Sequence, residues 1–168
     1  FYGCNDRQNR CDGGSSLIPW TFEEIATEYS NSQDTNRYVI ALNKIFSVID
    51  NANDPYGLPE LQKLIVKQAN EVKKFNKALY AYEGGQHLTS SSNSTLRELF
   101  IAANRDPRMG ERYTTLLNAW KAAGGQQFML YTQPQSFHQW GSFGIKESLL
   151  QPRSSAPKYD AAMKFQET

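Results

Sequence analysis

A chain of 168 residues has room for one domain with a hydrophobic core. Hydrophobic residues make up 39% of it and charged residues 21%, which is the composition of a globular protein and excludes a disordered one. The net charge is +1 with no block of like charge, so no basic face for nucleic acid is expected, and no apolar run is long enough to span a bilayer.

Two features at opposite ends of the first hundred residues favour a secreted protein. Cys4 and Cys11 lie in a polar, Gly-rich segment and could close a small disulfide ring in an oxidising compartment. Asn93 opens an Asn-Ser-Thr glycosylation sequon in a Ser-rich loop. The chain begins with Phe1 rather than Met and shows no signal peptide, so we interpret it as a mature or excised piece.

The first half of the chain predicts a strand end followed by three helices. Phe1-Tyr2-Gly3 reads as the end of a strand, and Thr21 with Glu24 forms a capping box for a helix that runs to about Tyr29. Asp34 or Thr35 is expected to cap a second helix, and Pro59 lies near the start of a third. The expected buried stripes of these two helices are Tyr38, Leu42, Ile45, Phe46 and Ile49, and Leu61, Leu64, Ile65, Val72 and Phe75.

The second half predicts a strand, two helices, another strand and a tail helix. The first strand ends at Glu83, and Thr95 or Ser94 is expected to cap the helix that follows. A break at 105–108 precedes a helix over 109–123, a short β run covers 127–132, and weak helical character marks 158–165. The apolar residues expected on the helices are Leu96, Leu99, Phe100, Ala103, Tyr113, Leu116, Leu117 and Trp120.

Strands separated by helices indicate an α/β fold with parallel strands joined by crossovers. Three strands make a small sheet for this length, so we expect partner strands from outside the chain.

The stretch 77–88 carries the strongest candidate for chemistry. Strand alternation places Leu79, Ala81 and Glu83 on one face, and Gly84-Gly85 frees the backbone to turn. A carboxylate at the C-terminal tip of a buried parallel strand is a usual catalytic position in α/β barrels. The alternative is a strand-end carboxylate bonded to nearby backbone N–H groups.

Four motifs in order then resemble a known group of enzymes. They are Phe-Tyr-Gly (1–3), Tyr-Glu-Gly-Gly-Gln-His-Leu (82–88), Trp-Gly-Ser-Phe-Gly (140–144) and Ala-Pro-Lys-Tyr (156–159). Together they resemble the C-terminal part of secreted clan A glycoside hydrolases, which are TIM (β/α)8 barrels. The resemblance implies that residues 1–168 form about the last three strand–helix units of such a barrel, incomplete on their own.

The resemblance also implies roles for particular residues. Glu83 matches the nucleophile of a retaining glycosidase, and Tyr2 matches a residue that hydrogen-bonds it. Trp140 matches the aromatic platform beneath the sugar, and Gln86 and His87 lie within reach of sugar hydroxyls. A retaining mechanism needs a second carboxylate about 5–5.5 Å from the first, and we expect that group, with the rest of the barrel, to come from outside this chain.

Two functions therefore stay open: a retaining glycoside hydrolase, and a non-catalytic extracellular protein that binds carbohydrate or has a structural role. Among the histidines, His138 is interpreted as an ordinary loop residue. The chain has no Ser-His-Asp order, phosphate loop or zinc-type spacing, so no cofactor or metal is expected.

Overall fold

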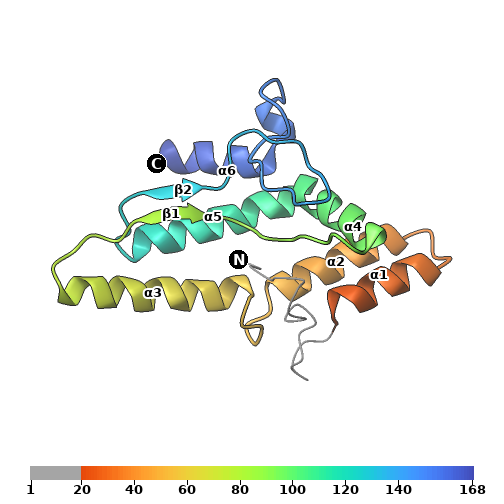
Figure 1. Cartoon of the computed structure of the whole chain (residues 1–168), viewed down its shortest axis with the longest axis horizontal. Coiled ribbons are helices and arrows are strands. Elements are labelled where there is room, and N and C mark those ends of the chain that lie inside the picture. The colour runs from red at the N-terminus through yellow and green to blue at the C-terminus, as the bar shows by residue number, and fades with distance from the viewer. Residues whose placement is uncertain (1–19) are drawn as a thin grey trace.

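A computed structural model describes residues 20–168 as helices around a short parallel sheet (Figure 1). The predictions for Tyr2, Cys4 and Cys11, and the strand end at 1–3, lie outside the described residues. The elements in chain order are α1 (Phe22–Asn31), α2 (Arg37–Ile49), α3 (Leu58–Lys74), β1 (Ala81–Gly84), α4 (Ser94–Arg105), α5 (Pro107–Ala122), β2 (Phe128–Leu130), the 3-10 turn η2 (Arg153–Ser155) and α6 (Pro157–Gln166).

The predicted parallel arrangement of the strands is confirmed. Strands β1 and β2 are hydrogen-bonded neighbours, and α4 and α5 form the crossover between them. The ladder includes the Tyr131 N–H, which donates to the Gly84 carbonyl at 2.9 Å. Within residues 20–168 the sheet has these two strands alone, so membership of a TIM barrel stays a prediction.

The core fills the space between the helices and one face of the strands. Phe22 of α1 meets Phe100 of α4 edge to face at 4.9 Å, and Trp120 of α5 meets Phe128 of β2 in the same way at 5.2 Å. The four predicted apolar positions of α5, Tyr113, Leu116, Leu117 and Trp120, are all buried. Helix α5 is therefore the element that joins the sheet to the helical layer, and it runs alongside the strands in Figure 1.

Helix ends follow the chain's capping chemistry, with two corrections. The capping box of Thr21 and Glu24 is present, and Asp106 both ends α4 and caps α5. The predicted caps Ser94 and Thr95 are wrong, because the Asn93 side chain accepts the Leu96 N–H at 3.0 Å.

The cap of α2 was also predicted at the wrong residue. Asn36 occupies the N-cap position and makes no side-chain cap. Asp34 Oδ1 instead accepts the Asn36 N–H at 2.7 Å, which forms a local turn before the helix.

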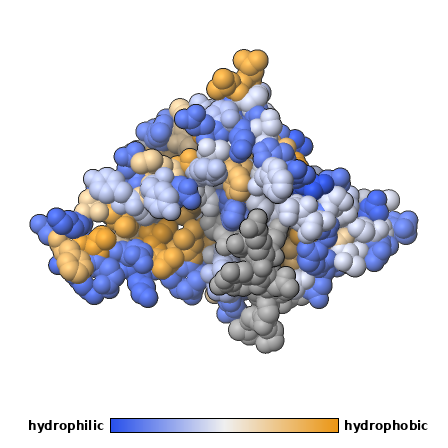
Figure 2. All heavy atoms as spheres, viewed as in Figure 1, coloured by the Kyte–Doolittle hydropathy of each residue, from blue (hydrophilic) through white to orange (hydrophobic). Residues whose placement is uncertain are grey.

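The burial predicted for α2 and α3 is wrong at three positions. Leu64 of α3 is 47% exposed, Phe75 directly after α3 is 72% exposed, and Tyr38 at the start of α2 is 47% exposed. Helix α3 buries only a narrow stripe, Leu58, Ile65 and Ala69. Apolar side chains consequently gather on the surface beside α3 and the strands, where Figure 2 shows orange patches.

The described residues contain no helix that is both long enough and apolar enough to cross a bilayer.

Candidate functional site

A hollow of about 440 Å³ opens at the C-terminal ends of the two strands. The residues that line it come from the end of β1, the turn after it, the residue after β2, and the later loop: Glu83, Gly84, Gly85, Gln86, His87, Tyr131 and Phe143. Neighbouring parallel strands end at the same edge of a sheet, so the side chains that follow them meet there. The hollow is therefore a consequence of the β1–β2 pairing.

Glu83 borders this hollow, and its side chain is exposed. The predicted alternation holds as far as Ala81, which packs against the core, but the register is irregular between Ala81 and Gly84. Among residues 20–168 the Glu83 carboxylate has no hydrogen bond or ion pair, so the reading of a carboxylate bonded to backbone N–H groups gains no support there.

The two glycines after Glu83 are required by close contacts. Gly85 has φ +147°, and a Cβ there would lie 2.7 Å from the Tyr113 hydroxyl. A Cβ on Gly84 would lie 2.3 Å from the Phe128 ring. The turn can thus approach α5 and β2 only without side chains at these positions.

Gln86 holds the turn rather than facing the opening. Its side chain is 3% exposed: Nε2 donates to the Ser142 carbonyl at 2.9 Å, and Oε1 accepts the Leu88 N–H at 2.7 Å. Its own N–H donates to the hydroxyl of buried Tyr113 at 3.1 Å, and burial raises the pKa of that tyrosine. We therefore assign Gln86 to the floor of the hollow, where both ends of its side-chain amide form hydrogen bonds with backbone groups.

An aromatic wall stands beside the carboxylate. The rings of His87 and Phe143 stack with centroids 5.2 Å apart and planes at 28°, and Tyr131 meets Phe143 edge to face at 5.4 Å. The backbone fixes this wall, because the Thr132 N–H donates to the Phe143 carbonyl and the Ile145 N–H to the Thr132 carbonyl, each at 3.1 Å. We call His87, Tyr131 and Phe143 the aromatic wall.

Trp140, the predicted platform, does not line the hollow. It is 67% exposed, and its backbone N–H donates to Nδ1 of His138 at 3.1 Å. Tyr131 and Phe143 occupy the place beside Glu83 instead, and sequence reasoning missed both. The available signal was position: Tyr131 directly follows the strand paired with β1.

The described residues place no second carboxylate in the hollow. Glu147 forms a two-bond ion pair with Arg105, at 2.8 and 2.6 Å, and this pairing lowers its pKa. Glu71 is likewise no candidate for the second carboxylate, because it lies within α3 and pairs with Lys74. Residues 20–168 also contain no cluster of His, Cys, Asp and Glu side chains that could hold a metal ion.

The sequon residue Asn93 is half-buried and engaged through both ends of its amide. Its Oδ1 caps α4 by accepting the Leu96 N–H, and its Nδ2 donates to a Glu23 carboxylate oxygen at 2.7 Å. A glycan on Nδ2 would replace this link to α1.

A buried lysine lies behind the aromatic wall. Lys158 at the start of α6 is 1% exposed, donates to Asn104 Oδ1 at 2.8 Å and to the Ser142 carbonyl, and sits 4.6 Å from the centre of the Phe137 ring. Burial lowers its pKa to about 7, against a smaller opposing effect of Glu147. Sequence reasoning noted the motif around this residue but not its burial.

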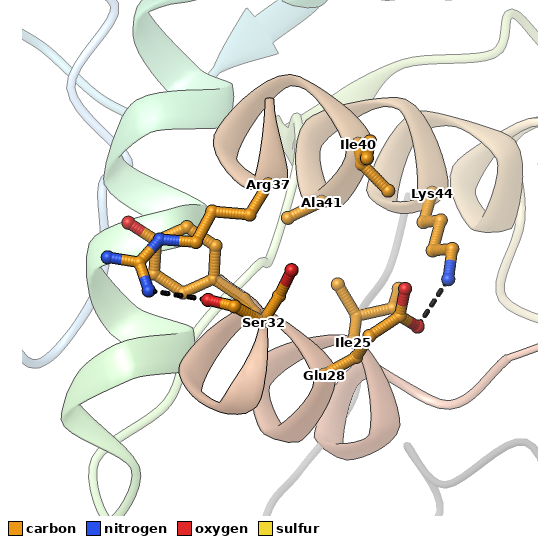
Figure 3. A pocket seen from close by; sticks show the side chains of 8 residues that line it. Ile25, Glu28, Ser32, Arg37, Ile40, Ala41 and Lys44 are labelled. Atoms are coloured by element: carbon orange, nitrogen blue, oxygen red, sulfur yellow. Dashed lines mark hydrogen bonds and ion pairs between the residues drawn. The ribbon is translucent and has the colours of Figure 1, made fainter. Parts of the chain in front are cut away.

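A smaller hollow lies between α1 and α2. It holds about 20 Å³, room for about one water, and is lined by the Glu28–Lys44 ion pair and by Arg37, which donates to the Ser32 carbonyl at 2.9 Å (Figure 3).

No family model matches the chain, no curated protein matches it, and no solved structure matches it.

Proposed function

We propose that this chain supplies part of the sugar-binding site of a retaining glycoside hydrolase, with Glu83 as the nucleophile. The observation that supports the proposal most directly is that Glu83 and the aromatic wall share one hollow at the ends of two parallel strands. Aromatic rings offer faces for the apolar side of a sugar, and the carboxylate stands beside them.

In the proposed reaction a Glu83 oxygen attacks the anomeric carbon while the glycosidic C–O bond breaks. The leaving oxygen takes its proton from a second carboxylic acid, which the rest of the protein, outside residues 20–168, would provide. Water then cleaves the glycosyl–Glu83 ester, with that second group acting as base.

The proposal includes the remaining expectations drawn from the resemblance. The rest of the barrel would complete the sheet, Tyr2 would hydrogen-bond Glu83, and the protein would be extracellular. Cys4 and Cys11 would then form a disulfide, and Asn93 would be a glycan acceptor.

A second candidate, a non-catalytic carbohydrate-binding protein, is favoured by one observation. Glu83 is the single acidic residue that lines the hollow among residues 20–168. If no acid faces it in the complete protein, the wall would bind sugar without cleaving it.

Covalent trapping separates the two candidates. The intact protein is incubated with dinitrophenyl 2-deoxy-2-fluoro-β-glycosides of glucose, xylose and mannose, and the labelled peptide is identified by mass spectrometry. A label on Glu83 supports the hydrolase, and a label on another carboxylate removes Glu83 from the mechanism. Glycan binding without label or hydrolysis supports the second candidate, and neither labelling nor binding refutes both.

The matched variants are Glu83→Gln and Glu98→Gln. Glu98 is an exposed residue of α4 away from the hollow. For a hydrolase we expect Glu83→Gln to lose at least a thousandfold in kcat while glycan binding persists, because the amide cannot act as nucleophile. Glu98→Gln should match the unchanged protein in both measurements.

A further inference from the structure

Behind the hollow, one carbonyl oxygen receives donors from two sides. The Ser142 carbonyl accepts Nε2 of Gln86, which belongs to the floor of the hollow, and Nζ of Lys158, which belongs to α6. Ser142 is itself buried and directly precedes Phe143 of the aromatic wall. The position of this carbonyl therefore determines where the wall begins.

Packing alone does not explain why a lysine occupies position 158. Its Nζ is buried with a neutral amide oxygen and a carbonyl as hydrogen-bond partners, and the carboxylate whose charge acts on it, Glu147, is already paired with Arg105. A methionine of similar length would fill the same space without the cost of removing an amine from water. The donor must therefore serve the groups it contacts.

Those three groups belong to α4 and to two places in the loop after β2. Asn104 lies near the end of α4, where its Nδ2 also donates to the Phe100 carbonyl at 2.9 Å, Ser142 lies in the loop after β2, and Phe137 lies earlier in the same loop. Lys158 connects all three to α6. Without it, the Ser142 carbonyl would keep the Gln86 bond but lose its links to α6 and, through Asn104, to α4. The Arg105–Glu147 ion pair would still join a later part of the loop to α4.

We propose that Lys158 is a positioning residue for the aromatic wall: its Nζ fixes the Ser142 carbonyl against α4 and thereby keeps Phe143 stacked on His87. For the sugar site this inference rests on the proposed function, because the wall is the surface on which the sugar would lie. The wall geometry itself can be measured without any sugar.

The test compares Lys158→Met with the unchanged protein by NMR and amide hydrogen exchange. In the variant we expect the His87 ring-proton signals to move toward those of an unstacked imidazole. The amides of Thr132 and Ile145 should exchange at least tenfold faster, while exchange in α1 and α2 stays unchanged. A merely space-filling lysine would leave the His87 signals where they are, and that result would overturn the proposal.

Two further variants keep the test decisive. Lys164→Met changes an exposed lysine on the same helix and should leave both measurements unchanged. If Lys158→Met does not fold, Asn104→Leu removes one acceptor of Nζ at similar volume, and the same shifts are expected at smaller size. Unchanged His87 signals in Asn104→Leu would then refute the role. If the intact protein binds no glycan, the proposed function is refuted, but the role of Lys158 in positioning the aromatic wall is still tested by the His87 signals.

Discussion

Replacing the buried Lys158 with methionine should change how the stability of the protein depends on pH. In the fold its pKa is lowered to about 7 because burial disfavours the charged amine, whereas in the unfolded chain it returns to the usual 10.5. Between these values the unfolded chain binds one more proton than the folded protein. The free energy of unfolding therefore rises with pH in this window, and the destabilisation is greatest below pH 7.

The magnitude follows from the size of this shift. Each pKa unit corresponds to about 1.4 kcal/mol, so the whole shift corresponds to roughly 5 kcal/mol as an upper limit. From pH 7.5 to 9.5 the contribution of Lys158 to the free energy of unfolding should rise by roughly 2–3 kcal/mol. The charged neighbours, Glu147 with its partner Arg105, keep their charge throughout this range.

The assay is urea unfolding at half-unit pH steps for the unchanged protein, Lys158→Met and Lys164→Met. Subtracting the free energies of unfolding of a variant from those of the unchanged protein at each pH cancels the contributions of other groups that titrate in the same range. The curve of Lys164→Met should run parallel to that of the unchanged protein, and the curve of Lys158→Met should lack the rise. A flat difference between the unchanged protein and Lys158→Met from pH 7.5 to 9.5 would show that the amine is not desolvated in the fold.

Three further predictions concern the turn and the start of α4, and each is tested by urea unfolding. Gly85→Ala should destabilise the protein by about 2–4 kcal/mol, because φ is +147° and the Tyr113 hydroxyl is too close, whereas Gly124→Ala, with φ +84° but open space, should cost only about 1 kcal/mol. Equal losses would rule out the close contact. Tyr113→Phe should cost about 1–3 kcal/mol because the Gln86 N–H loses its acceptor, and an unchanged free energy of unfolding would show that this N–H finds another. Asn93→Ala should cost about 1 kcal/mol through loss of the cap of α4, and Asn93→Asp should recover it; a loss in both would point to the contact with α1 instead.

The sequence predicted burial best where other elements cover the apolar face of a helix. The spacing of Tyr113, Leu116, Leu117 and Trp120 identified the buried positions of α5, which lies between the sheet and other helices. The same reasoning failed for Leu64 and Phe75, because periodicity shows which face of a helix is apolar but not whether another element covers it.

The candidate site was predictable where its residues are contiguous in sequence. Glu83 and His87 line the hollow as expected from one short motif. Tyr131 and Phe143 join them through the pairing of strands separated by two helices, which a local motif does not encode. Lys158 was hidden for a different reason: a charged residue in a weakly helical segment is normally expected at the surface.

The Gly-Gly turn sets a limit on how the hollow can be redesigned. Neither Gly84 nor Gly85 has space for even a methyl group. A side chain introduced at either position would therefore collide with α5 or β2 and could not extend into the hollow. Variation compatible with the scaffold is thus confined to the perimeter, at positions 87, 131 and 143. A library randomised at those three sites would vary the lining of the hollow without placing a side chain at Gly84 or Gly85.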